Sequence, residues 1–163
     1  YIIILHSGDF FYSKKSLYLL SKFINKNKNF DFYFSNILFY NQKNKNISRI
    51  WKISPKNNNN LNFLRIAHTS LCIKKDISTK IFYDEKLKIA GDMDYLFKLC
   101  KNCKGKYFNN FFIYMEDKGL SNSKKYFLKR LIEDIKILYK RFNLFFIFVL
   151  IYQISIKIPG VFI

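Results

Sequence analysis

Short apolar runs alternate with segments of helical spacing, and this alternation constrains the fold more than any other feature. The runs expected to form strands are Tyr1–Leu5, Phe32–Tyr40, Ile47–Ile53, Ile66–Ile73 and Tyr107–Tyr114. The segments expected to form helices are Ser13–Asn25, with Ser13 as N-cap, the short Lys75–Lys80, Asp92–Cys103 and a long helix from near Ser123. This mixture predicts an α/β domain with a mixed sheet.

The chain is strongly basic. Its 163 residues, enough for one domain or part of one, include 29 Lys and Arg against 11 Asp and Glu, a formal net charge of +18. Such a charge is typical of proteins that bind nucleic acid, anionic membranes or phosphorylated ligands. Lys, Asn, Ile, Phe and Tyr are abundant together, which also fits an AT-rich coding sequence. We expect no nucleic-acid partner, because no arginine motif for reading base edges is present.

Three cysteines do not form a disulfide framework. Cys100 and Cys103 have the spacing of half a zinc site or of a redox pair, but no second such pair follows. Two reduced thiols at a helix end are the simpler interpretation, and they fit a cytoplasmic protein.

Carboxylates gather at two turns. Asp9 follows the first strand in a turn opened by Gly8, and Asp92 and Asp94 begin the helix after Gly91. One interpretation is structural: Asp92 caps the helix and Asp94 is a first-turn acid favoured by the helix dipole. The other is that both turns border a ligand site, with His68 on the strand between them.

Five segments in this order resemble the bacterial family 2 glycosyltransferases, most closely those that build surface polysaccharide and lipopolysaccharide. They cover roughly residues 1 to 125 and read "YIIILHSGDFFYSKKSL", "ISRIWKI", "IAHTSLCIKKDI", "FYDEKLKIAGDMDYLFKLCKN" and "YMEDKGLSNS". The resemblance implies a GT-A fold, Rossmann-like with a mixed sheet. It also implies a divalent cation (Mg²⁺ or Mn²⁺), a nucleotide-sugar donor, and a glycan or lipid-linked acceptor of the cell envelope.

The resemblance implies a role for individual residues as well. Asp9 matches the last carboxylate of the metal- and diphosphate-binding motif, which also takes in Ser7 and Gly8. His6 stands where the family usually has Asn or Asp, so Asp9 holds the metal alone or with help from His6. Lys118 belongs to a Lys-Gly-Leu-Ser stretch that resembles the family's Gly-Gly-Val-Ser loop and helps to hold the diphosphate.

The family's acidic helix start implies the acid–base chemistry. Asp92 matches its first Asp and is the expected general base, while Asp94 matches the second and orients or supports it. His68 either hydrogen-bonds the donor phosphate or the acceptor, or is a satisfied structural histidine. We expect Asp9 and Asp92 to face one cleft at the C-terminal edge of the sheet, with His68 lining it.

The family places two or more βα units before the first motif, and the chain begins inside a strand without them. We therefore expect residues 1–122 to be the C-terminal part of a GT-A domain that lacks its N-terminal nucleotide-binding units. Residues 123–163 are expected to form an amphipathic to apolar helical tail.

The tail has three interpretations. Its apolar stripe, at helical spacing, comprises Phe127, Leu131, Ile135, Leu138 and Phe142. Leu144–Tyr152 is then uninterrupted apolar sequence, shorter than the ~20 residues of a spanning helix. Because basic residues precede it, we favour one continuous helix lying on the anionic cytoplasmic leaflet. The alternatives are packing against the domain or another copy, and a true span.

Together these features predict an inverting glycosyltransferase, peripheral at the inner face of the cell membrane. The alternative is a non-catalytic basic module that docks on an anionic membrane or on nucleic acid. Asp9, Asp92 and Asp94 separate the two hypotheses, because a binding module has no need of them.

Overall fold

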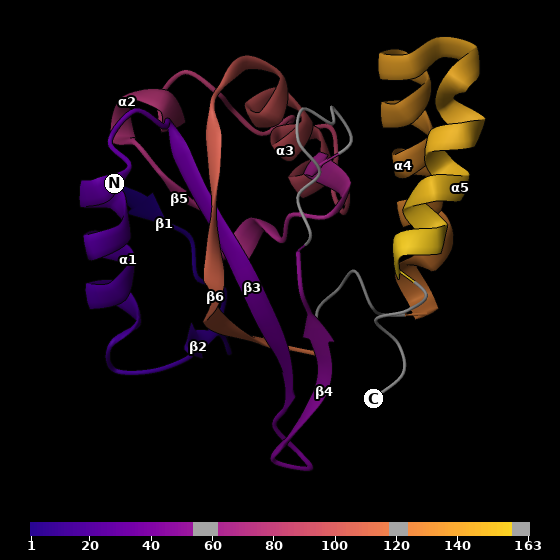
Figure 1. Cartoon of the computed structure of the whole chain (residues 1–163). Coiled ribbons are helices and arrows are strands. Elements are labelled where there is room, and N and C mark those ends of the chain that lie inside the picture. The colour runs from indigo at the N-terminus through magenta and orange to yellow at the C-terminus, as the bar shows by residue number, and fades with distance from the viewer. Residues whose placement is uncertain (54–61, 118–123, 158–163) are drawn as a thin grey trace.

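The computed structural model describes residues 1–53, 62–117 and 124–157, which form a mixed α/β structure (Figure 1). Its strands are β1 (Ile2–Ile3), β2 (Phe10–Phe11), β3 (Phe32–Asn41), β4 (Asn46–Trp51), β5 (Cys72–Ile73) and β6 (Gly105–Glu116). Its α-helices are α1 (Ser16–Lys26), α2 (Lys75–Ser78), α3 (Gly91–Asn102), α4 (Phe127–Phe142) and α5 (Phe146–Lys157). The described residues also include the 3-10 turns η1 (Asn62–Leu64), η2 (His68–Ser70), η4 (Lys124–Tyr126) and η5 (Asn143–Phe145).

The sheet is built around β3 and β6, which run parallel over almost their whole length. Its order is β1-β5-β3-β6-β2. The start of β3 pairs with β5, and its C-terminal half pairs with β4. Both β1 and β3 run antiparallel to β5, so β1, β3 and β6 all point the same way. β3 and β6 end together, with Tyr40 opposite Glu116, whereas β1 ends level with the start of β3. The C-terminal ends of parallel strands are where open α/β sheets bind ligands.

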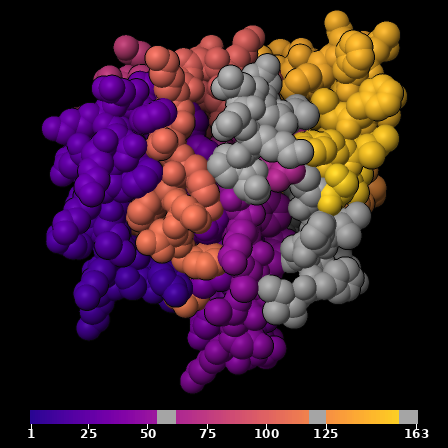
Figure 2. All heavy atoms as spheres, viewed as in Figure 1, coloured from indigo at the N-terminus to yellow at the C-terminus, as the bar shows by residue number. Residues whose placement is uncertain are grey.

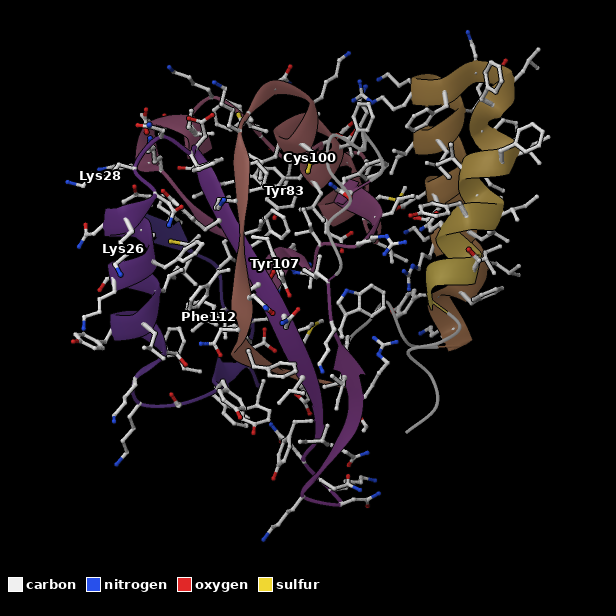
Figure 3. The ribbon with its side chains drawn as sticks, in the orientation of Figure 1. Lys26, Lys28, Tyr83, Cys100, Tyr107 and Phe112 are labelled. Carbon is white, nitrogen blue, oxygen red and sulfur yellow. The ribbon has the colours of Figure 1, made fainter. Side chains whose placement is uncertain are left out.

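Both faces of β3 are buried, which explains its nearly continuous apolar sequence. Phe32 and Phe34 pack into a cluster with α3 and the two C-terminal helices. Tyr33 and Ile37, on the opposite face, pack with α1 and with Phe112 of β6. Figure 3 shows Phe112 on the α1 side of the sheet and Cys100 on the α3 side.

The C-terminal helices form an antiparallel hairpin, and the predicted continuous helix is wrong. Asn143 takes a positive φ of 52°, which asparagine tolerates better than most residues, and η5 reverses the chain. α5 then folds back along α4 (Figure 1), with Phe146 against Tyr139. The hairpin forms one flank of the molecule (Figure 2).

The buried face of α4 also differs from the predicted stripe. Its buried residues are Glu133, Asp134, Ile137 and Leu138, whereas Phe127, expected in the stripe, is exposed. Polar residues are therefore two of the four buried residues on this face.

Three local expectations were also wrong. The strand predicted over Tyr1–Leu5 shortens to the two residues of β1, half exposed at the sheet edge. His68 lies in the turn η2 rather than on a strand. Lys15 occupies the N-cap position of α1, and Ser13 instead accepts the backbone N–H of Ser16 with its carbonyl.

Candidate functional site

A cavity of about 720 Å³ opens between the C-terminal end of β6 and the segment that follows β1. Segments far apart in the sequence supply its polar lining residues: His6, Ser7, Asp9, His68, Tyr83, Lys88, Asp92 and Glu116. Asp9, His68 and Asp92 thus share one cavity, the arrangement that the sequence led us to expect. Lys118 lies outside the described residues.

The turn His6–Asp9 holds the first carboxylate in place. The Asp9 amide donates to the His6 carbonyl at 3.0 Å, and the His6 amide donates to Asp9 Oδ2 at 3.2 Å. Asp9 Oδ1 accepts the backbone N–H of Glu116 at 3.2 Å, which ties the turn to the end of β6. Gly8 has φ of 91°, and a Cβ there would collide with the Glu116 carboxylate, so this turn requires glycine.

Two histidines link this turn to α3. His6 Nε2 and His68 Nε2 lie 2.6 Å apart, and the rings meet edge to face. His68 Nδ1 lies 3.4 Å from Asp92 Oδ2. At such a short separation the two Nε2 atoms share one proton, one ring donating and the other accepting. A chain of polar contacts therefore runs from the first turn of the protein to the start of α3.

Asp92 is the acid at the end of this chain. Its side chain retains 41% exposure, and Oδ1 accepts the backbone N–H of Met93 at 2.8 Å. Burial raises its pKa, but the hydrogen bond and charge of His68, the Met93 amide and the charge of Arg130 outweigh burial and lower the pKa overall. Asp92 is therefore ionised at neutral pH. The N-cap position belongs to Ala90, so Asp92 is not the cap of α3.

Asp94 faces another part of the molecule. It is 4% exposed and forms ion pairs with Lys98 Nζ at 2.6 Å and with Arg141 Nη2 of α4 at 2.8 Å. Burial raises its pKa, but these two cations lower it further than burial raises it. Asp94 lines neither this cavity nor the one described next, so we assign it to holding α3 against α4 rather than to contact with substrate.

A second cavity of about 160 Å³ adjoins the first. Four residues line both cavities: His68, Ile89, Asp92 and Met115. On its far side the second cavity is walled by the β3–β4 hairpin, by α3 and by the α4–α5 hairpin. His68 and Asp92 consequently stand between two spaces, which is where a group that acts on two reactants would have to stand.

Glu133 of α4 anchors the loop before Asp92. Its carboxylate accepts the backbone N–H groups of Lys88, Ile89 and Ala90 at 2.9–3.2 Å. Burial raises the pKa of Glu133, but these three donors and Lys129 lower it overall. Because Ile89 borders both cavities, the hairpin fixes the wall of the site as well as α3 itself.

The residues present offer few metal ligands. Within residues 1–53, 62–117 and 124–157, no group of three or more His, Cys, Asp or Glu is arranged to hold a metal ion. Mg²⁺ is often bound by one or two carboxylates together with substrate phosphates, and Asp9 fits that smaller role. His6 Nε2 already faces His68. All three cysteines are free, and burial with the neighbouring Cys103 raises the pKa of the Cys100 thiol to about 12.

Sequence reasoning missed several lining residues. Glu116 is the third residue of the quoted segment "YMEDKGLSNS" and the last residue of β6, so an acid at a strand end was a usable signal. Arg49 and Arg130 line the second cavity, and Glu133 anchors its wall. No local pattern marks these three, because their position depends on the packing of the hairpin.

Comparison of the chain with protein-family models, curated proteins and solved structures returned no match. Phe127–Ser155 is long and apolar enough, by length and composition, to cross a membrane. Within that stretch the chain reverses at η5, so the apolar sequence forms two shorter helices side by side.

Proposed function

We propose that this protein transfers a sugar from a nucleotide-sugar donor to a hydroxyl of a cell-envelope glycan or lipid-linked acceptor, inverting the anomeric carbon. The observation that carries the proposal is that Asp9, His68 and Asp92 line one cavity at the edge where parallel strands end. The resemblance to family 2 glycosyltransferases and the GT-A fold that it implies belong to the same proposal.

Asp92 is the proposed general base. An acceptor hydroxyl is a weak nucleophile, and an ionised carboxylate at the boundary of two spaces is placed to take its proton as the oxygen attacks. The bond between the anomeric carbon and the donor phosphate oxygen breaks as the new glycosidic bond forms. The nucleoside diphosphate leaves with the electron pair, and attack from the opposite face inverts the centre.

Asp9 serves the leaving group. When bound, Mg²⁺ or Mn²⁺ supplies charge neutralisation to the diphosphate, and Asp9 is the carboxylate that would hold it. Its two hydrogen bonds to the His6 and Glu116 amides fix the carboxylate at the cavity wall. His68, held between His6 and Asp92, orients the base and presents a polar ring to either reactant.

The hairpin is the proposed membrane contact, at the inner face of the cell membrane. Its exposed apolar residues are Phe127, Leu128, Ile132, Tyr139, Leu144, Phe145, Ile147, Phe148, Ile151 and Ile154. Lys129, Lys136 and Lys140 are exposed on the same helix pair. An apolar surface bordered by lysines favours an anionic lipid interface.

Asp92→Asn tests the proposal, because the amide keeps the shape but no longer accepts a proton. The protein expressed from its complete gene is incubated with membranes and a panel of uridine, guanosine and cytidine diphosphate sugars, and nucleoside diphosphate release is measured. We expect turnover to fall ~10²-fold or more. Asp76→Asn, an exposed acid of α2, is the matched control. Normal turnover in Asp92→Asn would exclude the base.

A further inference from the structure

The second cavity brings two arginines together. Arg49 comes from β4 and Arg130 from α4, and both line the same space of about 160 Å³. Aromatic and aliphatic side chains, among them Phe39 and Trp51, form much of the remaining wall. A water molecule occupies ~30 Å³ of liquid. The cavity thus has room for one small group, not for a whole nucleotide.

Arg49 is held by aromatic rings rather than by an acid. Its guanidinium carbon lies 3.7 Å from the centre of the Phe39 ring and 5.2 Å from that of Trp51. In the part of the chain that the structure describes, Arg49 forms no ion pair with a carboxylate. Burial, and then the charge of Arg130, lower its pKa. Its N–H donors therefore remain available to an anion that enters the cavity.

The acids of the cavity already have cationic or polar donors of their own. Asp134 Oδ2 accepts a hydrogen bond from Gln153 Nε2 at 3.1 Å and lies 3.9 Å from Arg130 Nε. Asp92 faces His68 on the opposite wall. Arg130 contributes to lowering the pKa of Asp92 as well, so its charge reaches the base. The arginine pair thus flanks the proposed base without neutralising it.

We propose that this cavity is an acceptor subsite that binds a phosphate group between Arg49 and Arg130, with the acceptor hydroxyl directed towards Asp92. Planar guanidinium groups bind phosphate through paired N–H donors, and aromatic stacking leaves these donors in place. The inference rests on the proposed function and names its acceptor class: a phosphorylated acceptor. The α4–α5 hairpin forms one wall of the cavity, and its opposite, outer face is apolar. This arrangement favours a phosphorylated acceptor that is delivered from the membrane.

Trp51 provides the readout. It is the one tryptophan of the chain, it lines the cavity, and its Nε1 donates to the Arg65 carbonyl at 2.7 Å, which fixes the indole. Its fluorescence reports a ligand in this space directly. The measurement needs no turnover, so its outcome is independent of the outcome of the transfer assay.

The experiment titrates the protein with farnesyl phosphate, farnesol and inorganic phosphate while Trp51 fluorescence is recorded. We expect a saturable change with farnesyl phosphate and none with farnesol. Arg49→Gln and Arg130→Gln should each weaken binding ~10-fold or more. Lys43→Gln, the same loss of charge on an exposed turn of the β3–β4 hairpin, should leave it unchanged.

The two sources of phosphate give different results. Tighter binding of farnesyl phosphate than of inorganic phosphate identifies a lipid-linked acceptor. Equal affinity, still lost in both arginine variants, identifies a soluble phosphorylated acceptor and also supports the subsite. Binding that both arginine variants retain, with circular dichroism showing them folded, would overturn the proposal, as would the absence of any saturable change.

Discussion

The sheet and the C-terminal hairpin distribute their apolar residues in opposite ways. In the sheet, apolar side chains such as Tyr33 and Ile37 are fully buried. In the hairpin, Leu144, Phe145 and Phe148 are 71–81% exposed, while Glu133, Asp134 and Gln153 are buried. The hairpin is therefore joined to the protein by buried polar contacts as well as by apolar packing, and it turns much of its apolar surface outward.

Apolar residues therefore have two different functions in this protein. In the sheet they stabilise the fold, because burying apolar area is the main favourable contribution to folding. The hairpin has only part of its apolar surface inside, through residues such as Leu138 and Val149, which pack with α3. Its exposed apolar residues gather on one helix pair, and contiguous apolar patches are typical of interaction surfaces.

The largest expected effect is the loss of stability when a buried apolar side chain is shortened. Leu99 is fully buried in α3, so Leu99→Ala should lower the free energy of unfolding by ~2–5 kcal/mol. Phe148 is 71% exposed, so Phe148→Ala should change the free energy of unfolding by ~0.5 kcal/mol or less in the absence of lipid. Urea unfolding of both variants measures the difference. Equal losses would show that the hairpin's outer face is covered in solution.

The next largest effect is expected from the hydrogen bonds that Glu133 of the hairpin accepts. Glu133→Gln removes a carboxylate that accepts three backbone N–H groups, and we expect a loss of ~1–3 kcal/mol in the free energy of unfolding. Glu85→Gln, an exposed acid, serves as the control. Urea unfolding measures both. A Glu133→Gln variant as stable as the control would mean that packing alone attaches the hairpin.

The membrane contact should show both charge and apolar contributions. Binding to vesicles with anionic lipid should weaken in high salt without vanishing, since each Lys or Arg near the surface contributes ~1 kcal/mol and the apolar part does not depend on salt. Replacing Phe145 and Phe148 with Ser should reduce co-sedimentation ~10-fold or more. If the intact protein stays in the supernatant at low salt, the outer face contacts protein instead.

Acid should weaken the attachment of the hairpin before it affects the sheet. The pKa values of Asp92, Asp94 and Glu133 are all lower in the fold than their ordinary values of 3.8 and 4.5. Their stabilisation is complete above those ordinary values and is lost as pH falls through the lower folded values. Unfolding followed from pH 7 to 3 should therefore show a decline below about pH 4.5, shallower in Asp94→Asn.

Local patterns allowed prediction of the sheet far better than of the hairpin. The runs around β3 and β6 identified the central strands. In β3 the reason is burial on both faces, which leaves a long apolar sequence. The break at Asn143 was not predicted, because the apolar run continues through it and only one backbone angle marks the reversal. Buried Glu133 and Asp134 were missed because their partners lie on other elements.

The site was also partly predictable from local sequence patterns. Asp9, His68 and Asp92 each stand in a short recognisable segment, and the fold brings the Asp9 turn, η2 and the start of α3 to one cavity. Asp94 is two residues from Asp92 but points towards Arg141, and a helix turn does not reveal which acid faces which neighbour before α4 is placed. Arg49 and Arg130 meet across 81 residues of chain, beyond the reach of any local pattern.

The two acids of α3 give the most direct test of the central claim. Asp92→Asn and Asp94→Asn should be assayed together for sugar transfer, at a temperature where circular dichroism shows both folded. The account predicts that Asp92→Asn loses ~10²-fold or more in kcat while still binding nucleoside diphosphate, and that Asp94→Asn keeps most of its kcat. The reverse pattern, with kcat lost in Asp94→Asn and retained in Asp92→Asn, would contradict it.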